Sequence, residues 1–107
     1  MGMYNQIMKY NKLVRDKIPG YIQKKGGNPH YHVADDVEYW NKLKEKLLEE
    51  VQEFNDDENL EEIADILEVL DAIVRHKKFN QQEIEQTRAE KARERGVFQE
   101  RIILEES

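Results

Sequence analysis

Apolar residues recur at intervals of three, four and seven along much of this chain, a spacing that predicts helices. One long helix is expected to begin at Asp35 or Asp36 and to end near Phe54. Its apolar residues are Val37, Trp40, Leu43, Leu47, Leu48, Val51 and Phe54. Two further helices are expected over residues 59–75 and 80–96. The predicted fold class is therefore all-α, an antiparallel helical bundle with little or no β-structure.

Capping and turn residues predict the remaining boundaries. Asn80 and Glu83 form a capping box at the start of the third long helix. Pro19 suits the first turn of a short helix, which the glycine pair at 26–27 would end. Residues 97–104 are expected to be extended, docking as an arm or a short strand. The expected parts of this single domain are a basic arm with the short helix (1–34), a helical core (35–96) and an extended tail (97–107).

The second long helix is unusually apolar. Its apolar residues cover well over half of the helix circumference. They are Leu60, Ile63, Ala64, Ile66, Leu67, Val69, Leu70, Ile73 and Val74. A helix of this kind needs cover on two sides, so the sequence predicts a homodimer, a homotetramer or another homo-oligomer that completes the bundle.

Composition excludes several classes of protein. The chain has 107 residues, which suits one domain, and no cysteine, which removes disulfides and thiolate chemistry. Residues 31–74 carry fifteen acidic side chains against three lysines, so binding to nucleic-acid polymers is not expected. No apolar run is long enough to cross a membrane, and the first residues lack the apolar core of a signal peptide. A cytoplasmic protein is expected.

Carboxylates on the predicted helices are the candidate ligands of a metal site. Glu62 falls inside the apolar arc of the second long helix, and Asp65 falls at its edge. A short turn makes the two long helices antiparallel neighbours, which brings Glu50 and Glu53 opposite them. Four oxygen ligands of this kind suit Mg²⁺ or Mn²⁺. The alternative interpretation is a solvated acidic face with no ligand, which is common in charged helices.

The acidic residues have the order of a known motif. Glu49-Glu50-x-x-Glu53 followed by Glu62-x-x-Asp65 resembles the signature of the MazG-like all-α nucleoside triphosphate pyrophosphohydrolases. Two departures from the usual pattern are visible: only eight residues separate the two acidic elements, and Val97 stands where a second glycine is usual.

Two other segments strengthen the resemblance. Residues 10–19, Tyr-Asn-Lys-Leu-Val-Arg-Asp-Lys-Ile-Pro, are similar to the amino-terminal signature of the phosphoribosyl-ATP pyrophosphohydrolase-like subgroup. Residues 91–98 and 101–104 resemble that subgroup's carboxyl end, so the resemblance covers roughly residues 10–104.

The resemblance implies an activity and a set of ligands. The expected reaction is Mg²⁺-dependent hydrolysis of a nucleoside triphosphate to the monophosphate and pyrophosphate, in the removal of non-canonical nucleotides. The family motif places metal ligands at Glu50, Glu53, Glu62 and Asp65. Glu49 would orient water or support the ligands from outside the set.

Basic residues near the amino terminus are the candidate phosphate contacts. Lys12, Arg15 and Lys17 would supply the positive charge that a triphosphate needs beyond the metal, and Arg95 is a further candidate. The alternative is that these cations hold the arm against the acidic helices. Two other functions also remain open: hydrolysis of phosphoribosyl-ATP in histidine biosynthesis, and a non-catalytic helical interaction module.

Overall fold

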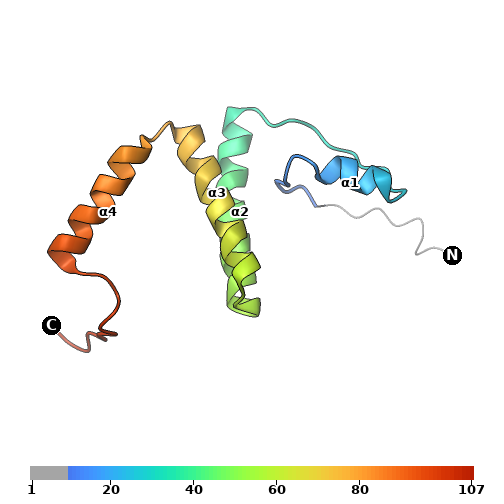
Figure 1. Cartoon of the computed structure of the whole chain (residues 1–107). Helices are drawn as coiled ribbons and strands as arrows, with labels where there is room; N and C mark the ends of the chain where they lie inside the picture. The colour runs from blue at the N-terminus through green and yellow to red at the C-terminus, as the bar shows by residue number, and fades with distance from the viewer. Residues whose placement is uncertain (1–9) are drawn as a thin grey trace. The chain divides into compact units, whose positions relative to one another are not determined.

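The computed structural model describes residues 10–107 and is all-helical within them. The helices are α1 (Ile18–Lys24), α2 (Asp36–Asp57), α3 (Leu60–Lys77) and α4 (Gln81–Arg95), shown in Figure 1. No strand occurs among these residues, which confirms the predicted all-α class. The chain divides into two compact units, Met1–Ile73 and Val74–Ser107, and each is described by itself. The expectation of a single domain stays a prediction.

The short helix α1 begins and ends where the sequence predicts. Pro19 stands in its first turn, where a missing N–H costs nothing. After Lys25, Gly26 takes a φ of 89°, a conformation that glycine adopts readily. The N–H of Gly27 then donates to the carbonyl oxygen of Ile22 at 2.9 Å, which closes the end of the helix.

Helix α2 is capped at both ends by local geometry. The Asp35 side chain accepts a hydrogen bond from the N–H of Glu38 at 2.9 Å, a standard N-cap. The helix runs to Asp57, three residues past the predicted end near Phe54. It stops at Glu58, whose left-handed backbone (φ 39°, ψ 41°) reverses the chain.

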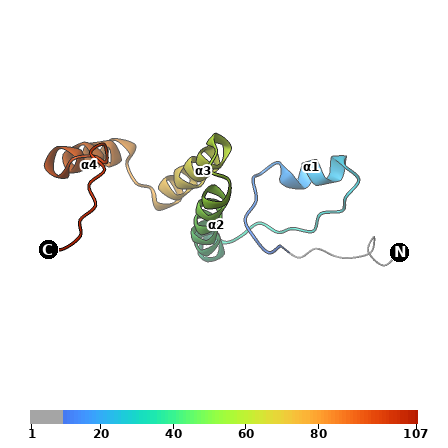
Figure 2. The same ribbon diagram turned by 90° about the horizontal axis from the view of Figure 1, so that it is seen from below.

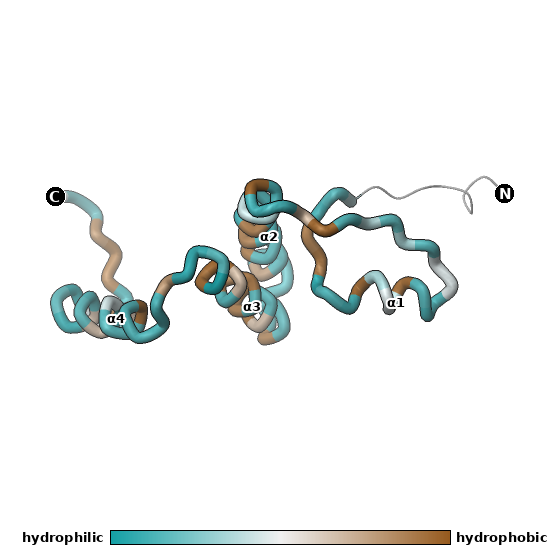
Figure 3. The backbone as a smooth tube through the Cα atoms, turned by 90° about the horizontal axis from the view of Figure 1, so that it is seen from above, coloured by the Kyte–Doolittle hydropathy of each residue, from teal (hydrophilic) through white to brown (hydrophobic). Residues whose placement is uncertain are grey.

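Helix α3 returns antiparallel to α2, so the two form a helical hairpin (Figures 1 and 2). Asn59 caps α3 by accepting a hydrogen bond from the N–H of Glu62 at 3.1 Å. The buried hydrophobic residues of the described chain are Leu43 on α2 and Val69 on α3, which are 1% and 8% exposed. Such a small core leaves other apolar residues of the hairpin uncovered, and Figure 3 shows apolar positions along both helices.

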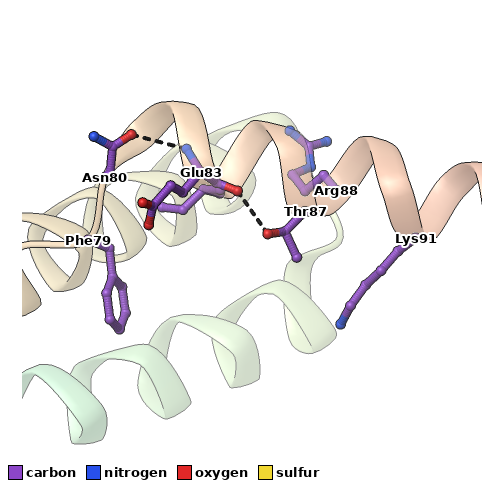
Figure 4. Close-up of a pocket in the computed structure, with 7 residues that line it drawn as sticks. Phe79, Asn80, Glu83, Thr87, Arg88 and Lys91 are labelled. Carbon is purple, nitrogen blue, oxygen red and sulfur yellow. Dashed lines mark hydrogen bonds between the residues drawn. The ribbon is translucent and has the colours of Figure 1, made fainter.

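The second unit contains α4 and the tail. Asn80 accepts a hydrogen bond from the N–H of Glu83 at 3.0 Å, which confirms the predicted cap, and the helix ends at Gly96 with φ 83°. An open hollow of about 320 Å³ lies along α4, between Phe79 and Lys91 (Figure 4). Residues 101–107 have no regular secondary structure and are exposed.

Within residues 10–107, no helix combines the length and the apolar character that crossing a bilayer requires.

Candidate metal centre

Three carboxylates from two helices meet in the α2–α3 hairpin. Glu50 of α2 and Glu62 and Asp65 of α3 each place an oxygen within 4.8 Å of the others. Oxygen atoms at this separation can bind one divalent cation. Three of the four residues predicted as ligands are therefore brought together.

The hairpin core fixes these positions. Glu50 follows the buried Leu43 by seven residues, so both face α3. Glu62 and Asp65 precede the buried Val69 by seven and four residues, so they share its face of α3. The same apolar spacing that joins the two helices also directs the carboxylates toward each other.

Glu50 is the most buried of the three carboxylates, with 8% of its surface exposed. A buried carboxylate needs a cation or hydrogen-bond donors. Lys46, one turn earlier on α2, lies 3.2 Å from it and 3.5 Å from Glu49. The sequence analysis did not single out Lys46, although its spacing of four residues from Glu50 is a recognised signal for a helical ion pair.

The segment just before α1 contacts the side of the hairpin that carries Glu49 and Asp65, which we call its acidic side. Arg15 donates a hydrogen bond to Asp65 at 2.7 Å, and Lys12 donates one to Glu49 at 2.9 Å. Lys42 of α2 also donates to the backbone oxygen of Asn11 at 2.6 Å. From here on, the name basic arm refers only to residues 10–17, the described part of the predicted arm that precedes α1. Its contacts match the alternative interpretation of these cations, in which they hold the arm against the acidic helices.

The pKa values of Glu62, a member of the group of three, and of the neighbouring Glu49 are shifted in opposite directions. The pKa of Glu62 is raised, first by loss of hydration and then by repulsion from Glu53 and Asp65. Burial also works to raise the pKa of Glu49, but the hydrogen bond and charge of Lys12 and the charge of Lys46 outweigh it and lower the value. The hydrogen bond to Glu49 in turn raises the pKa of Lys12.

The other predicted site residues lie in different positions. Glu53 is exposed and outside the group of three, yet its charge acts on both Glu62 and Lys12. Lys17 is the N-cap residue of α1. Within the described residues it forms no ion pair with the carboxylates of the hairpin. Arg95 stands in the last turn of α4, in the second unit.

The donor set fits a hard divalent cation. All three groups are carboxylates, with no histidine or sulfur ligand, which favours Mg²⁺ or Mn²⁺ over zinc or copper. The raised pKa of Glu62 also favours a cation at this position, because carboxylates that repel each other are stabilised most by a shared cation.

Comparison with known protein families, with curated proteins and with solved structures finds no match to this chain. The resemblance to MazG-like enzymes therefore stays a prediction from the motifs alone.

Proposed function

We propose that this protein is a metal-dependent nucleotide pyrophosphohydrolase that converts a nucleoside triphosphate and water into the monophosphate and pyrophosphate. One observation supports the proposal above all others: Glu50, Glu62 and Asp65 converge within 4.8 Å at the positions of the acidic motif. A solvated acidic face would not require Glu50 to be buried.

In this proposal each residue has a defined task. Glu50, Glu62 and Asp65 would hold the cation, and Glu53, whose side chain is exposed nearby on α2, would be a further ligand. When bound, Mg²⁺ polarises phosphoryl oxygens and lowers the pKa of an attacking water. Glu49, next to the ligands and with a lowered pKa, stays ionised and orients water.

The basic arm would supply the phosphate contacts. Arg15 now contacts Asp65, where a bound cation would replace it, and Lys12 contacts the neighbouring Glu49. Both would then stand beside the bound cation and would neutralise the charge that builds on the pyrophosphate leaving group. Lys17 is a weaker candidate, since among the described residues it forms no ion pair with a carboxylate of the cluster, and Arg95 stays a candidate from the second unit.

Two alternatives have specific support. The motif in residues 10–19 resembles the phosphoribosyl-ATP pyrophosphohydrolase-like subgroup, so that nucleotide is a candidate substrate for the same centre. The second alternative is a non-catalytic interaction module. The ion pairs of Glu49, Glu50 and Asp65 with side chains of the same chain favour it, because those carboxylates are balanced without a metal.

The test is release of pyrophosphate from canonical and modified nucleoside triphosphates and from phosphoribosyl-ATP, with Mg²⁺, with Mn²⁺ and with EDTA. Release that needs the metal, and that Glu62→Gln abolishes while Glu61→Gln preserves it, would support the proposal. Glu61 is the matched control because it is exposed and adjacent. Absence of release from every substrate, or an active Glu62→Gln variant, would contradict it.

A further inference from the structure

Tyr10, at the start of the basic arm, is an aromatic residue that is exposed and yet held in place. It is 63% exposed, so its ring does not contribute to a core. The ammonium group of Lys12 lies over the ring, 5.8 Å from the ring centre. A cation in this position is attracted by the electrons of the aromatic face. An exposed ring that is fixed beside a cation is suited to stacking on a flat ligand.

The hairpin fixes the backbone next to Tyr10. Asn11 has a left-handed backbone with a φ of 45°, which is uncommon for a residue other than glycine. Its carbonyl oxygen accepts a hydrogen bond from Nζ of Lys42 on α2 at 2.6 Å. Asparagine tolerates this conformation better than most residues, and the hydrogen bond stabilises it. The position of Tyr10 is therefore set by a contact with α2.

The basic arm lies along the acidic side in a definite order. Arg15 contacts Asp65 of the group of three, and Lys12 contacts Glu49 at 2.9 Å. Tyr10 comes next, because the Lys12 ammonium links its ring to Glu49. In a nucleoside triphosphate, the ribose separates the base from the metal-binding phosphates by a comparable length. Phosphates bound beside these two cations would therefore leave the base within reach of the Tyr10 ring.

We propose that Tyr10 stacks on the nucleobase of the nucleotide whose phosphates the carboxylates and the basic arm bind. The inference rests on the proposed function and adds a base-binding residue to it, since the other groups of the centre bind only metal and phosphate. Every nucleobase has a flat aromatic face, so stacking on one ring favours nucleotides over base-free phosphates without selecting a single base.

Tyr21 on α1 is a matched control for Tyr10. It is 61% exposed, and the ammonium group of Lys25 lies 5.7 Å from its ring centre. The two tyrosines thus share their exposure and their contact with a lysine. They differ in one respect: within residues 10–107, no ion pair joins Lys25 to a carboxylate of the hairpin, whereas Lys12 is paired with Glu49.

The test compares a nucleotide with a ligand that has phosphates and no base. The two ligands are α,β-methylene ATP, which cannot be hydrolysed to the monophosphate and pyrophosphate, and inorganic tripolyphosphate. Calorimetric titration in the same excess of Mg²⁺ gives the dissociation constant of each. Tyr10→Ala should raise the constant for the ATP analogue about tenfold, because the stacked ring is lost, and leave that for tripolyphosphate unchanged. Tyr10→Phe, which keeps the ring, and Tyr21→Ala should both bind like the natural protein.

Three results would overturn the base-stacking role. The first is an unchanged affinity of Tyr10→Ala for the ATP analogue. The second is an equal loss for both ligands, which would mean that Tyr10 acts on phosphate through Lys12. The third is a loss in Tyr10→Phe as large as in Tyr10→Ala, which would assign the effect to the hydroxyl group. Each of these leaves the proposed function standing, whereas a natural protein that binds neither ligand would contradict both proposals.

Discussion

The two sides of the α2–α3 hairpin differ in their side chains and in how the rest of the chain covers them: one side carries carboxylates, and the other carries apolar residues. On the acidic side, Lys46, Lys12 and Arg15 balance carboxylates that would otherwise repel one another. On the other side, which we call the apolar side, residues 10–73 provide no such cover, and six apolar side chains are 40–81% exposed: Leu48, Val51, Leu60, Ile63, Leu67 and Leu70. Glu49, Asp65 and Glu50 have cation partners within the chain, whereas the apolar side chains stay exposed. We expect a competing cation to reverse the first arrangement.

The largest expected effect is on the acidic side. Glu62→Gln keeps the shape and the Asn59 cap but removes a negative ligand. Pyrophosphate release should fall on the order of a hundredfold or more, as expected when a carboxylate is lost from a metal centre. Steady-state kinetics at saturating Mg²⁺ measures this. Glu61→Gln should stay near the natural rate, and equal losses in both variants would place the effect outside the cluster.

The matching change on the apolar side is Leu67→Glu. It puts a charge where the second copy is expected, so the dissociation constant of the dimer should rise on the order of a hundredfold. Analytical ultracentrifugation measures the constant, and circular dichroism reports whether the helices persist. Glu68→Lys, a charge change at the next residue, should leave the mass unchanged. A dimeric Leu67→Glu protein would mean that this stripe is not the interface.

A smaller effect is expected from Arg15→Gln, which removes the cation paired with Asp65. The pair is partly exposed, so the affinity for Mn²⁺ without nucleotide should rise about two- to fivefold. KM for the triphosphate should rise as well, because a phosphate contact is lost. Calorimetric titration and kinetics measure the two effects. Lys24→Gln, on α1, is the control. Unchanged Mn²⁺ affinity would show that Arg15 and the metal do not compete.

The smallest effects concern stability and pH in the metal-free protein. Since the pKa of Glu62 is raised above its ordinary value of 4.5, the folded chain holds this proton to higher pH than the unfolded chain. Stability is therefore lost as pH rises through the folded pKa. Glu62→Gln should melt at a higher temperature than the natural protein at pH 7 and at a similar temperature below pH 4.5.

The contribution of Glu49 to stability should change with pH in the opposite direction. Its pKa is lowered, so it contributes stability above 4.5 that is lost as pH falls through the folded pKa. Glu49→Gln should therefore lower the melting temperature at pH 7 and not in acid. Melting curves of both variants from pH 3 to 8 would reveal the contrast, and shifts of the same sign in both would contradict the electrostatic account.

The helices were predictable because local signals define them. Pro19, Asp35 and Asn80 lie where the sequence analysis expects helices to begin, and the structure confirms each. The end of α2 was predicted three residues too early, near Phe54, because the polar run 55–57 is typical of a turn. The reversal comes instead at Glu58, in a left-handed conformation that the sequence does not mark with glycine.

The cluster was only partly predictable. The spacing on two antiparallel helices was enough to bring Glu50, Glu62 and Asp65 together. It was not enough for Glu53, because a rotation of about 60° from the stripe moves a side chain into solvent. The ion pairs of Lys12 and Arg15 depend on the path of a non-helical segment, which no periodicity describes.

The separation in sequence between the basic arm and its partners has a kinetic consequence. Lys12 and Glu49 are 37 residues apart, and Arg15 and Asp65 are 50 apart, whereas α2 and α3 join through one tight turn. Contacts close in sequence form first in folding. We therefore expect the carboxylates to meet before the arm's cations arrive, and their repulsion to slow that early step. Salt, which screens this repulsion, should speed formation of the hairpin and slow docking of the arm.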